Sequence, residues 1–122
     1  RVHLLGWLPD ARAMLKEVDA YASTSVDDGL GNSMTESLAL HVPIVAADAG
    51  GPGEIMRPVH ERTGVGLFEP RSARALADAV TMLRAANVRE AVIAAQDQRF
   101  EDFVIARTAA QTLALYREVV TE

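Results

Sequence analysis

The sequence predicts an α/β fold with about four short parallel strands, flanking helices and a helical carboxyl-terminal end. Three observations support this prediction. Short apolar runs alternate with segments of helical periodicity, the connections between them are only a few residues long, and glycine-rich turns follow two of the predicted strands. Segments that alternate in this way form parallel sheets wound by right-handed crossovers. A chain of 122 residues is long enough for one compact domain.

The first part of the chain contains two of the predicted strands and a short helix. Residues 2–6 form an apolar run closed by a glycine, which predicts a strand. Asp10 is placed to cap a helix of about two turns that ends near Val18. Residues 19–24 predict a second strand, whose small side chains suit a sheet that is buried on both faces.

The next segment predicts a loop, a helix and a third strand. Residues 27–31 contain two aspartates and two glycines, which favour a loop. Asn32 is a favourable N-cap for a helix that ends near His41, because Pro43 follows shortly afterwards. Residues 43–47 predict the third strand, with the proline at its first position.

The remainder of the chain predicts one more strand and several helices. In residues 48–55 glycines follow the third strand and we expect one helical turn, whereas residues 58–64 are expected to be a loop. Residues 65–68 predict the fourth strand. From Ser72 onward, apolar residues recur at helical spacing in three successive segments, so the chain is expected to close as helix.

Composition excludes several classes of function. The formal net charge is -5 and the chain has a single lysine, so no basic face is available for nucleic acid. The absence of cysteine excludes disulfides, thiol nucleophiles and thiolate metal sites. No apolar run approaches the ~20 residues that span a bilayer. We therefore expect a cytoplasmic location and no membrane span in this chain, while peripheral attachment of the complete protein stays open.

The loop and helix of residues 28–36 have the features of an anion-binding site. A helix N-terminus carries unpaired N–H groups and about half a positive charge, so the backbone from Gly31 to Met34 is suited to a phosphate. Glu36 lies on the second turn of this helix, where its carboxylate can accept hydrogen bonds from hydroxyls, as acidic residues do when they hold a ribose. Asp28 is placed to address a second set of hydroxyls. Together these features indicate a sugar nucleotide.

Each feature also has a simpler explanation. Glycines at a strand-to-helix corner are more often turn formers than ligand contacts, and a helical glutamate is commonly just solvated. Asp27 and Asp28 lack a third oxygen ligand in register, so we expect no metal site. His41 is expected to cover the last carbonyls of its helix.

Three short segments have a recognisable spacing. Residues 28–39 read DGLGNSMTESLA, residues 43–48 read PIVAAD, and a Gly-Gly pair at residues 50–51 is followed by Glu54 and Ile55. This pattern closely resembles the carboxyl-terminal, nucleotide-binding domain of family 4 (group 1) retaining glycosyltransferases. Its signature is an acidic pair with seven residues between, a glycine-rich loop, a proline-led strand and a Gly-Gly turn. The flanking segments are similar as well, so the resemblance covers nearly the whole chain.

The resemblance implies a fold, a reaction and a set of site residues. Such enzymes have two Rossmann-like lobes in the GT-B arrangement, and the donor is bound mainly by the second lobe. By this resemblance Glu36 holds the ribose of a nucleoside diphosphate sugar, and Asp28, the implied catalytic residue, contacts the donor sugar near its reacting carbon. No metal and no cofactor besides the donor substrate are implied. The implied substrate-binding residues are Gly29, Leu30, Gly31, Asn32, Ser33, Met34, Glu36, Gly50 and Gly51.

The chain departs from the family pattern at several points. Asp28 stands where glutamate is usual, which shortens its reach by one methylene, and His41 stands where a glycine often adopts a left-handed conformation. The upstream Arg and Lys that neutralise the diphosphate in the family have no counterpart here. We therefore interpret residues 1–122 as a single partial Rossmann-like domain, the latter part of the donor lobe. The acceptor lobe, which would bind a glycan, a lipid or a small molecule, is absent, and the fragment alone is expected to be inactive.

Two other interpretations stay open. A non-catalytic α/β module of receiver type also places acidic residues at strand ends, but it requires a lysine late in the sheet, and the one lysine is Lys16. A sugar-phosphate isomerase-like domain shares Ser and Gly loops at helix N-termini. That interpretation leaves the spacing of Asp28 and Glu36 unexplained.

Overall fold

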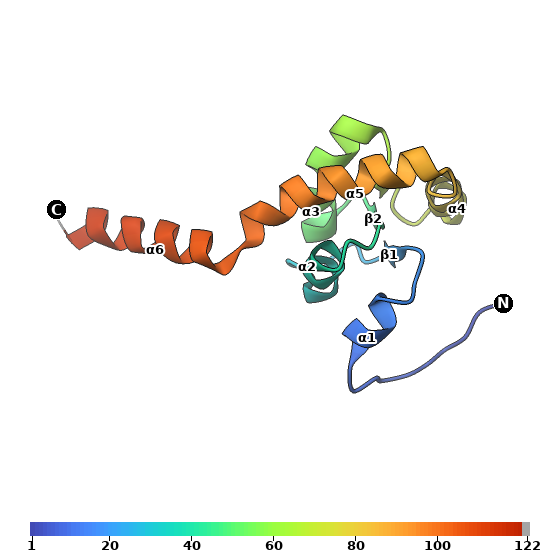
Figure 1. Ribbon diagram of the computed structural model, residues 1–122, viewed down its shortest axis with the longest axis horizontal. Coiled ribbons are helices and arrows are strands. Elements are labelled where there is room, and N and C mark those ends of the chain that lie inside the picture. Colours follow the sequence, from blue (N-terminus) through green and yellow to red (C-terminus); the bar gives the residue numbers. More distant parts are fainter. Residues whose placement is uncertain (121–122) are drawn as a thin grey trace.

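The computed structural model describes residues 1–120 and has an α/β architecture around a three-stranded parallel sheet (Figure 1). The strands are β1 (Tyr21–Ser23), β2 (Ile44–Ala47) and β3 (Leu67–Phe68), and they lie in the order β1-β2-β3. Tyr21 pairs with Ile44, and Ala46 pairs with Leu67. The predicted fold class is confirmed, with three strands where about four were expected.

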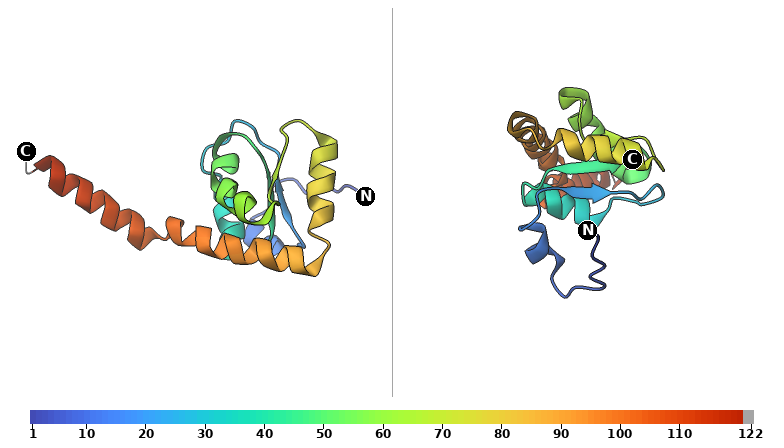
Figure 2. Two further views of the ribbon diagram at one scale, coloured as in Figure 1. Left: turned by 90° about the horizontal axis from the view of Figure 1, so that it is seen from above. Right: turned by 90° about the vertical axis from the view of Figure 1, so that its right-hand side faces the viewer.

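Helices surround the sheet and extend the chain beyond it. They are α1 (Ala11–Leu15), α2 (Asn32–Ala39), α3 (Gly50–Thr63), α4 (Ala73–Met82), α5 (Ala86–Phe100), the short 3-10 helix η1 (Glu101–Phe103) and α6 (Ile105–Val120). Helix α2 contacts β1 and β2, whereas α3 and α4 contact β2 and β3. Helix α5 packs against both α2 and α3, and α6 continues outward from the end of α5 (Figure 2).

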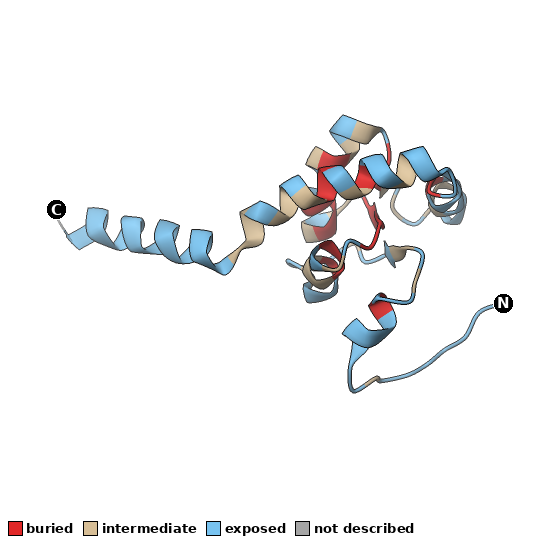
Figure 3. Cartoon of the chain, in the orientation of Figure 1, coloured by how far each residue is buried: buried red, intermediate tan, exposed pale blue. Residues whose placement is uncertain are grey.

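The core lies around β2, all four residues of which are fully buried (Figure 3). The flanking helices contribute the apolar side chains that cover it: Met34 and Leu38 from α2, Ile55, Met56 and Val59 from α3, and Val92 and Ala95 from α5. Because both faces of this strand are covered, an almost continuous apolar run from residue 42 to residue 47 is what its position requires.

A buried polar side chain fastens α5 to the start of β2. Gln96 is fully buried, and its Oε1 accepts a hydrogen bond from the backbone N–H of Ile44 at 2.8 Å. Its Nε2 donates to the carbonyl of Val42 at 2.9 Å. The amide thereby satisfies one donor and one acceptor of buried backbone, and each would be costly to leave unpaired.

The strand predicted for residues 2–6 is wrong. This segment contains no strand, and Val2 and Leu4 are 89% and 96% exposed. Its apolar pattern is that of a strand, but a strand forms only where a neighbour supplies the other half of the hydrogen-bond ladder. None of the three strands in the described part of the chain pairs with it.

The single helical turn and the loop predicted for residues 48–64 are also wrong, because α3 is one helix of 14 residues. Proline at position 58 suggested a break, since it removes one backbone hydrogen bond inside a helix. In the structure the helix continues through Pro58 to Thr63, and its C-cap is Gly64, which has φ +71. Ile55, Met56 and Val59 are buried on both sides of the proline, and this packing outweighs the lost bond.

One of the two expected caps is confirmed, and Ser72 caps a further helix, α4. Asp10 Oδ1 accepts from the N–H groups of Arg12 and Ala13, and Ser72 Oγ accepts from that of Ala75. The expectation for Asn32 is wrong by one residue, because Gly31 is the N-cap of α2 and has φ 66. A left-handed glycine at the N-cap supplies no side-chain hydrogen bond to the N–H groups of the first turn.

Helix α6 confirms the prediction that the chain closes as helix, but its apolar side chains are exposed (Figure 3). Ile105, Tyr116 and Val119 are 80%, 64% and 66% exposed. Among residues 1–120, none of the helices is both long and apolar enough to cross a membrane.

Candidate functional site

The two glycine loops meet at the carboxyl ends of β1 and β2. The backbone N–H of Gly51 donates to the carbonyl of Asp28 at 3.0 Å. A Cβ atom at position 51 would lie 1.6 Å from the carbonyl oxygen of Gly29, so only glycine fits there. Gly50 has φ +54, and a Cβ on it would come within 3.0 Å of the Asp28 carbonyl oxygen. The glycines thus allow one loop to lie directly against the other.

The carboxylate of Asp28 lies beside the N-terminus of α2. A Cβ atom built on Gly31, the N-cap of this helix, would be 3.4 Å from Asp28 Oδ2. A negative charge at this position is favourable because the helix N-terminus carries partial positive charge. The structure therefore brings together the acidic side chain, the glycine loop and the helix end that the sequence pointed to.

The predicted site residues differ in how far they are accessible. Glu36 is partly buried and reaches the surface from the second turn of α2. Met34 is 1% exposed and packs in the core, and its N–H donates to the carbonyl of Gly31 at 2.9 Å, so it offers a ligand neither its side chain nor its N–H group. The exposed members of the predicted set are Asp28, Gly29, Leu30, Asn32, Ser33 and Gly50.

Two hollows open on either side of Leu30 and Phe103. The first, which we call the Glu36 hollow, has a volume of about 340 Å³ and is lined by Leu30, Thr35, Glu36, Ala39, Phe100, Phe103 and Thr108. The second, the Arg99 hollow, has a volume of about 310 Å³ and is lined by Gly29, Leu30, Gly51, Glu54, Ile55, Arg99 and Phe103. Both are within the size range of small-molecule sites. Together they join α2, the two glycine loops and the end of α5.

Arg99 is a site residue that the sequence analysis missed. Its Nε donates to the carbonyl of Ile55 at 3.2 Å, and a terminal nitrogen contacts Asp102 at 2.6 Å. The guanidinium also lies 4.8 Å from the centre of the Phe103 ring. These contacts hold a cation in the hollow that Gly29 and Gly51 line. The sequence signals only the local pair with Asp102, because the approach to the glycine loops depends on tertiary packing of α5.

His41 adopts the left-handed conformation expected at the end of α2, with φ 57. The side chain was expected to cover the last carbonyls of its own helix. It instead contacts helix α5, where its Nδ1 lies 2.8 Å from Asp97 Oδ1. Within the part of the chain that the structure describes, no group of three His, Cys, Asp or Glu side chains is arranged to hold a metal ion.

Comparison with known proteins identifies the family of this fold and site. A family model described as glycosyl transferases group 1 matches residues 1–86, which include both glycine loops, α2 and β2. The chain belongs to the group 1 glycosyltransferases. The match covers more than half of the chain, and it confirms the resemblance to group 1 glycosyltransferases that the sequence suggested.

Two named glycosyltransferases are similar to part of this chain. The lipopolysaccharide core biosynthesis glycosyltransferase LpsE of Rhizobium meliloti (strain 1021) is 39% identical over 57 residues, which are 47% of this chain. The putative teichuronic acid biosynthesis glycosyltransferase TuaC of Bacillus subtilis (strain 168) is 34% identical over 70 residues, which are 57% of this chain. The aligned segments span 17% of the length of each of these two glycosyltransferases.

Proposed function

We propose that this chain is the nucleotide-sugar-binding part of a retaining, family 4 glycosyltransferase. The complete enzyme would transfer a glycosyl group from a nucleoside diphosphate sugar to an acceptor hydroxyl. Membership of the group 1 glycosyltransferases supports the reaction class. The observation that carries the proposal is the meeting of the two glycine loops beside Asp28 and the uncapped N-terminus of α2, with Glu36 lining the adjoining hollow.

Each part of this arrangement has a role in the proposal. The first N–H groups of α2, at Asn32 and Ser33, would receive the diphosphate, because a helix N-terminus favours anions. The Glu36 carboxylate would accept hydrogen bonds from the ribose hydroxyls. Asp28 would contact the donor sugar. The departing phosphate would be stabilised electrostatically in a transition state of oxocarbenium character.

We further propose that the chain forms the latter part of the donor lobe of a GT-B enzyme. The aligned segments span only 17% of the length of the two relatives. This supports the interpretation of the chain as one part of a larger enzyme. The acceptor, whether a glycan, a lipid or a small molecule, would be bound by another lobe, and the isolated chain would bind nucleotide without transferring sugar. The proposal requires no metal and no cofactor.

Titration calorimetry with UDP, GDP and ADP tests nucleotide binding by the complete protein. We expect one of the three to bind, and Glu36→Ala to weaken that binding about tenfold, because hydrogen bonds to a charged group contribute about 1.5–3 kcal/mol. Asp28→Ala is expected to lower the rate of transfer while the nucleotide affinity changes little. If none of the nucleotides binds, the proposal fails. Equal losses of affinity in both variants, with the fold retained, would overturn the division of roles.

A further inference from the structure

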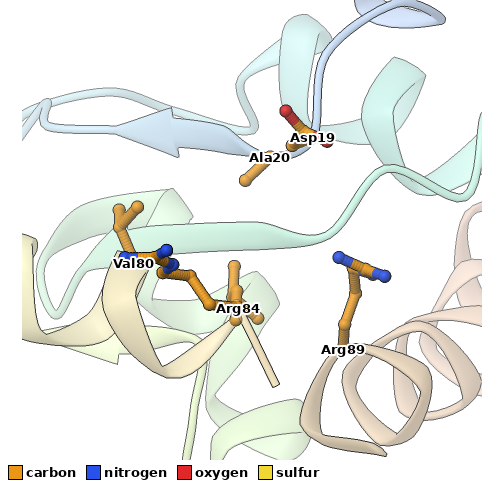
Figure 4. Close-up of a pocket in the computed structure, with 6 residues that line it drawn as sticks. Asp19, Ala20, Val80, Arg84 and Arg89 are labelled. Atoms are coloured by element: carbon orange, nitrogen blue, oxygen red, sulfur yellow. The ribbon is translucent and has the colours of Figure 1, made fainter. Parts of the chain in front are cut away.

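A third hollow lies at the end of the sheet where β1 begins, opposite the end that carries the glycine loops. Figure 4 shows residues that line it. It has a volume of about 330 Å³ and is lined by Asp19, Ala20, Val80, Leu83, Arg84 and Arg89. Asp19 and Ala20 directly precede β1, whereas the first glycine loop follows that strand. The hollow is therefore separate from the site formed by Asp28 and Glu36. The proposed function in nucleotide-sugar binding assigns this hollow no role.

Two arginines line this hollow, Arg84 just after α4 and Arg89 on the first turn of α5 (Figure 4). Within residues 1–120 neither guanidinium forms an ion pair, unlike Arg57, Arg99 and Arg107. Backbone hydrogen bonds fix their positions, from Arg84 N–H to the Thr81 carbonyl at 3.1 Å and from Arg89 N–H to the Ala85 carbonyl at 3.0 Å.

The placement of Arg89 is electrostatically unfavourable in the absence of an anion. A cation on the first turn of a helix lies near the end of the helix dipole that is already positive. Helix α5 has no acidic residue in its first turn, and its N-cap, Ala85, supplies no side-chain hydrogen bond. An anion bound between Arg84 and Arg89 would relieve this repulsion and accept hydrogen bonds from both guanidinium groups, which recognise phosphate particularly well.

The remaining lining residues indicate what the anion is attached to. Asp19 also lines the hollow and would repel a bare anion, but its carboxylate can accept hydrogen bonds from hydroxyl groups. Ala20, Val80 and Leu83 provide an apolar surface between the charged groups. We propose that this hollow binds a phosphate ester of a polyhydroxyl compound, with the phosphate held by Arg84 and Arg89 and a hydroxyl held by Asp19.

Titration calorimetry of the complete protein with glucose 6-phosphate tests this site. Arg84→Gln and Arg89→Gln are each expected to weaken binding roughly tenfold or more, because each removes a charge-assisted hydrogen bond. Arg71→Gln is the matched control, since this exposed arginine precedes the other end of α4. Glu36→Ala, which is expected to weaken nucleotide binding, should leave the affinity for glucose 6-phosphate unchanged, because Glu36 does not line this hollow. Asp19→Asn should weaken glucose 6-phosphate but strengthen inorganic phosphate.

A phosphoinositol lipid offers the same chemistry on a membrane. Sedimentation with phosphatidylcholine vesicles, with and without phosphatidylinositol, distinguishes that source from a soluble phosphate ester. Binding of either ligand that depends on both arginines supports the site. Absence of binding to both ligands, or binding that the Arg84→Gln and Arg89→Gln variants retain, overturns it, and neither result affects the nucleotide-binding proposal.

Discussion

Strand β2 and helix α6 are both rich in apolar residues, yet they lie in opposite environments. All four residues of β2 are fully buried, whereas Leu113, Leu115 and Tyr116 of α6 are 50% or more exposed. The difference is in their neighbours. Strand β2 lies between β1 and β3 and is covered by α2, α3 and α4, while α6 makes its contacts in the described chain mainly with η1. An apolar pattern thus predicts the type of element, but not whether the chain supplies a surface to cover it.

The candidate site depends on the well-packed region. Both glycine loops follow strands of the sheet and α2 packs on it, so their geometry is set by the buried core around β2. Substitutions in the core around β2 and in α6 test this contrast, because the surroundings of their side chains differ most. They run from the largest expected loss of stability to the smallest.

The contact between the two glycine loops gives the largest expected effect. Gly51→Ala would place a methyl group 1.6 Å from the Gly29 carbonyl oxygen, so the loops must separate. We expect a loss of about 3 kcal/mol in the free energy of unfolding, at the upper end of the range for overpacking, together with weaker nucleotide binding. Gly29→Ala is the matched control, because nothing lies within 4 Å of its added Cβ atom. Urea unfolding of both variants measures the difference, and equal stability would show that the loops do not pack as described.

The hydrogen bonds by which Gln96 joins α5 to the start of β2 are expected to give the next largest loss of stability. Gln96→Leu keeps a side chain of similar size but leaves the Ile44 N–H and the Val42 carbonyl without their partner. We expect a loss of about 2 kcal/mol, because unsatisfied buried polar groups cost about 1–3 kcal/mol each and the added apolar contact offsets part of that. Gln98→Leu, at an exposed position two residues along the same helix, controls for the loss of an amide. Urea unfolding of both variants measures the loss. An unchanged unfolding midpoint for Gln96→Leu would mean that water or another group forms hydrogen bonds with the Ile44 N–H and the Val42 carbonyl.

Local chemistry explains which features the sequence could predict. The strand at β2 follows from the proline and the apolar run, the helix starts follow from Asp10 and Ser72, and the loop before α2 follows from its glycines and aspartates. The acidic and glycine residues of the candidate site also follow from short-range spacing. Each of these signals lies within about a dozen residues, whereas Gly50 and Gly51 were assigned to the site by the family resemblance.

Features that depend on distant parts of the chain were not predictable in this way. Helix α3 continues through Pro58 because Met56 and Val59 are buried, and burial is decided by the rest of the fold. The role of Gln96 and the approach of Arg99 to the glycine loops both depend on where α5 packs. Residues 2–6 show the reverse case, since they have the pattern of a strand but pair with no strand of the described chain.

The exposed side chains of α6 give the smallest expected effect. Leu113→Ala should change the free energy of unfolding of this chain by less than about 0.5 kcal/mol, because the side chain is already half exposed and leaves no cavity. Leu38→Ala, the same substitution at a fully buried position on α2, should cost about 3 kcal/mol. Urea unfolding of the two variants compares the regions directly. A loss above 1 kcal/mol for Leu113→Ala would show that α6 packs against the rest of the chain, and the contrast between the two regions would not hold.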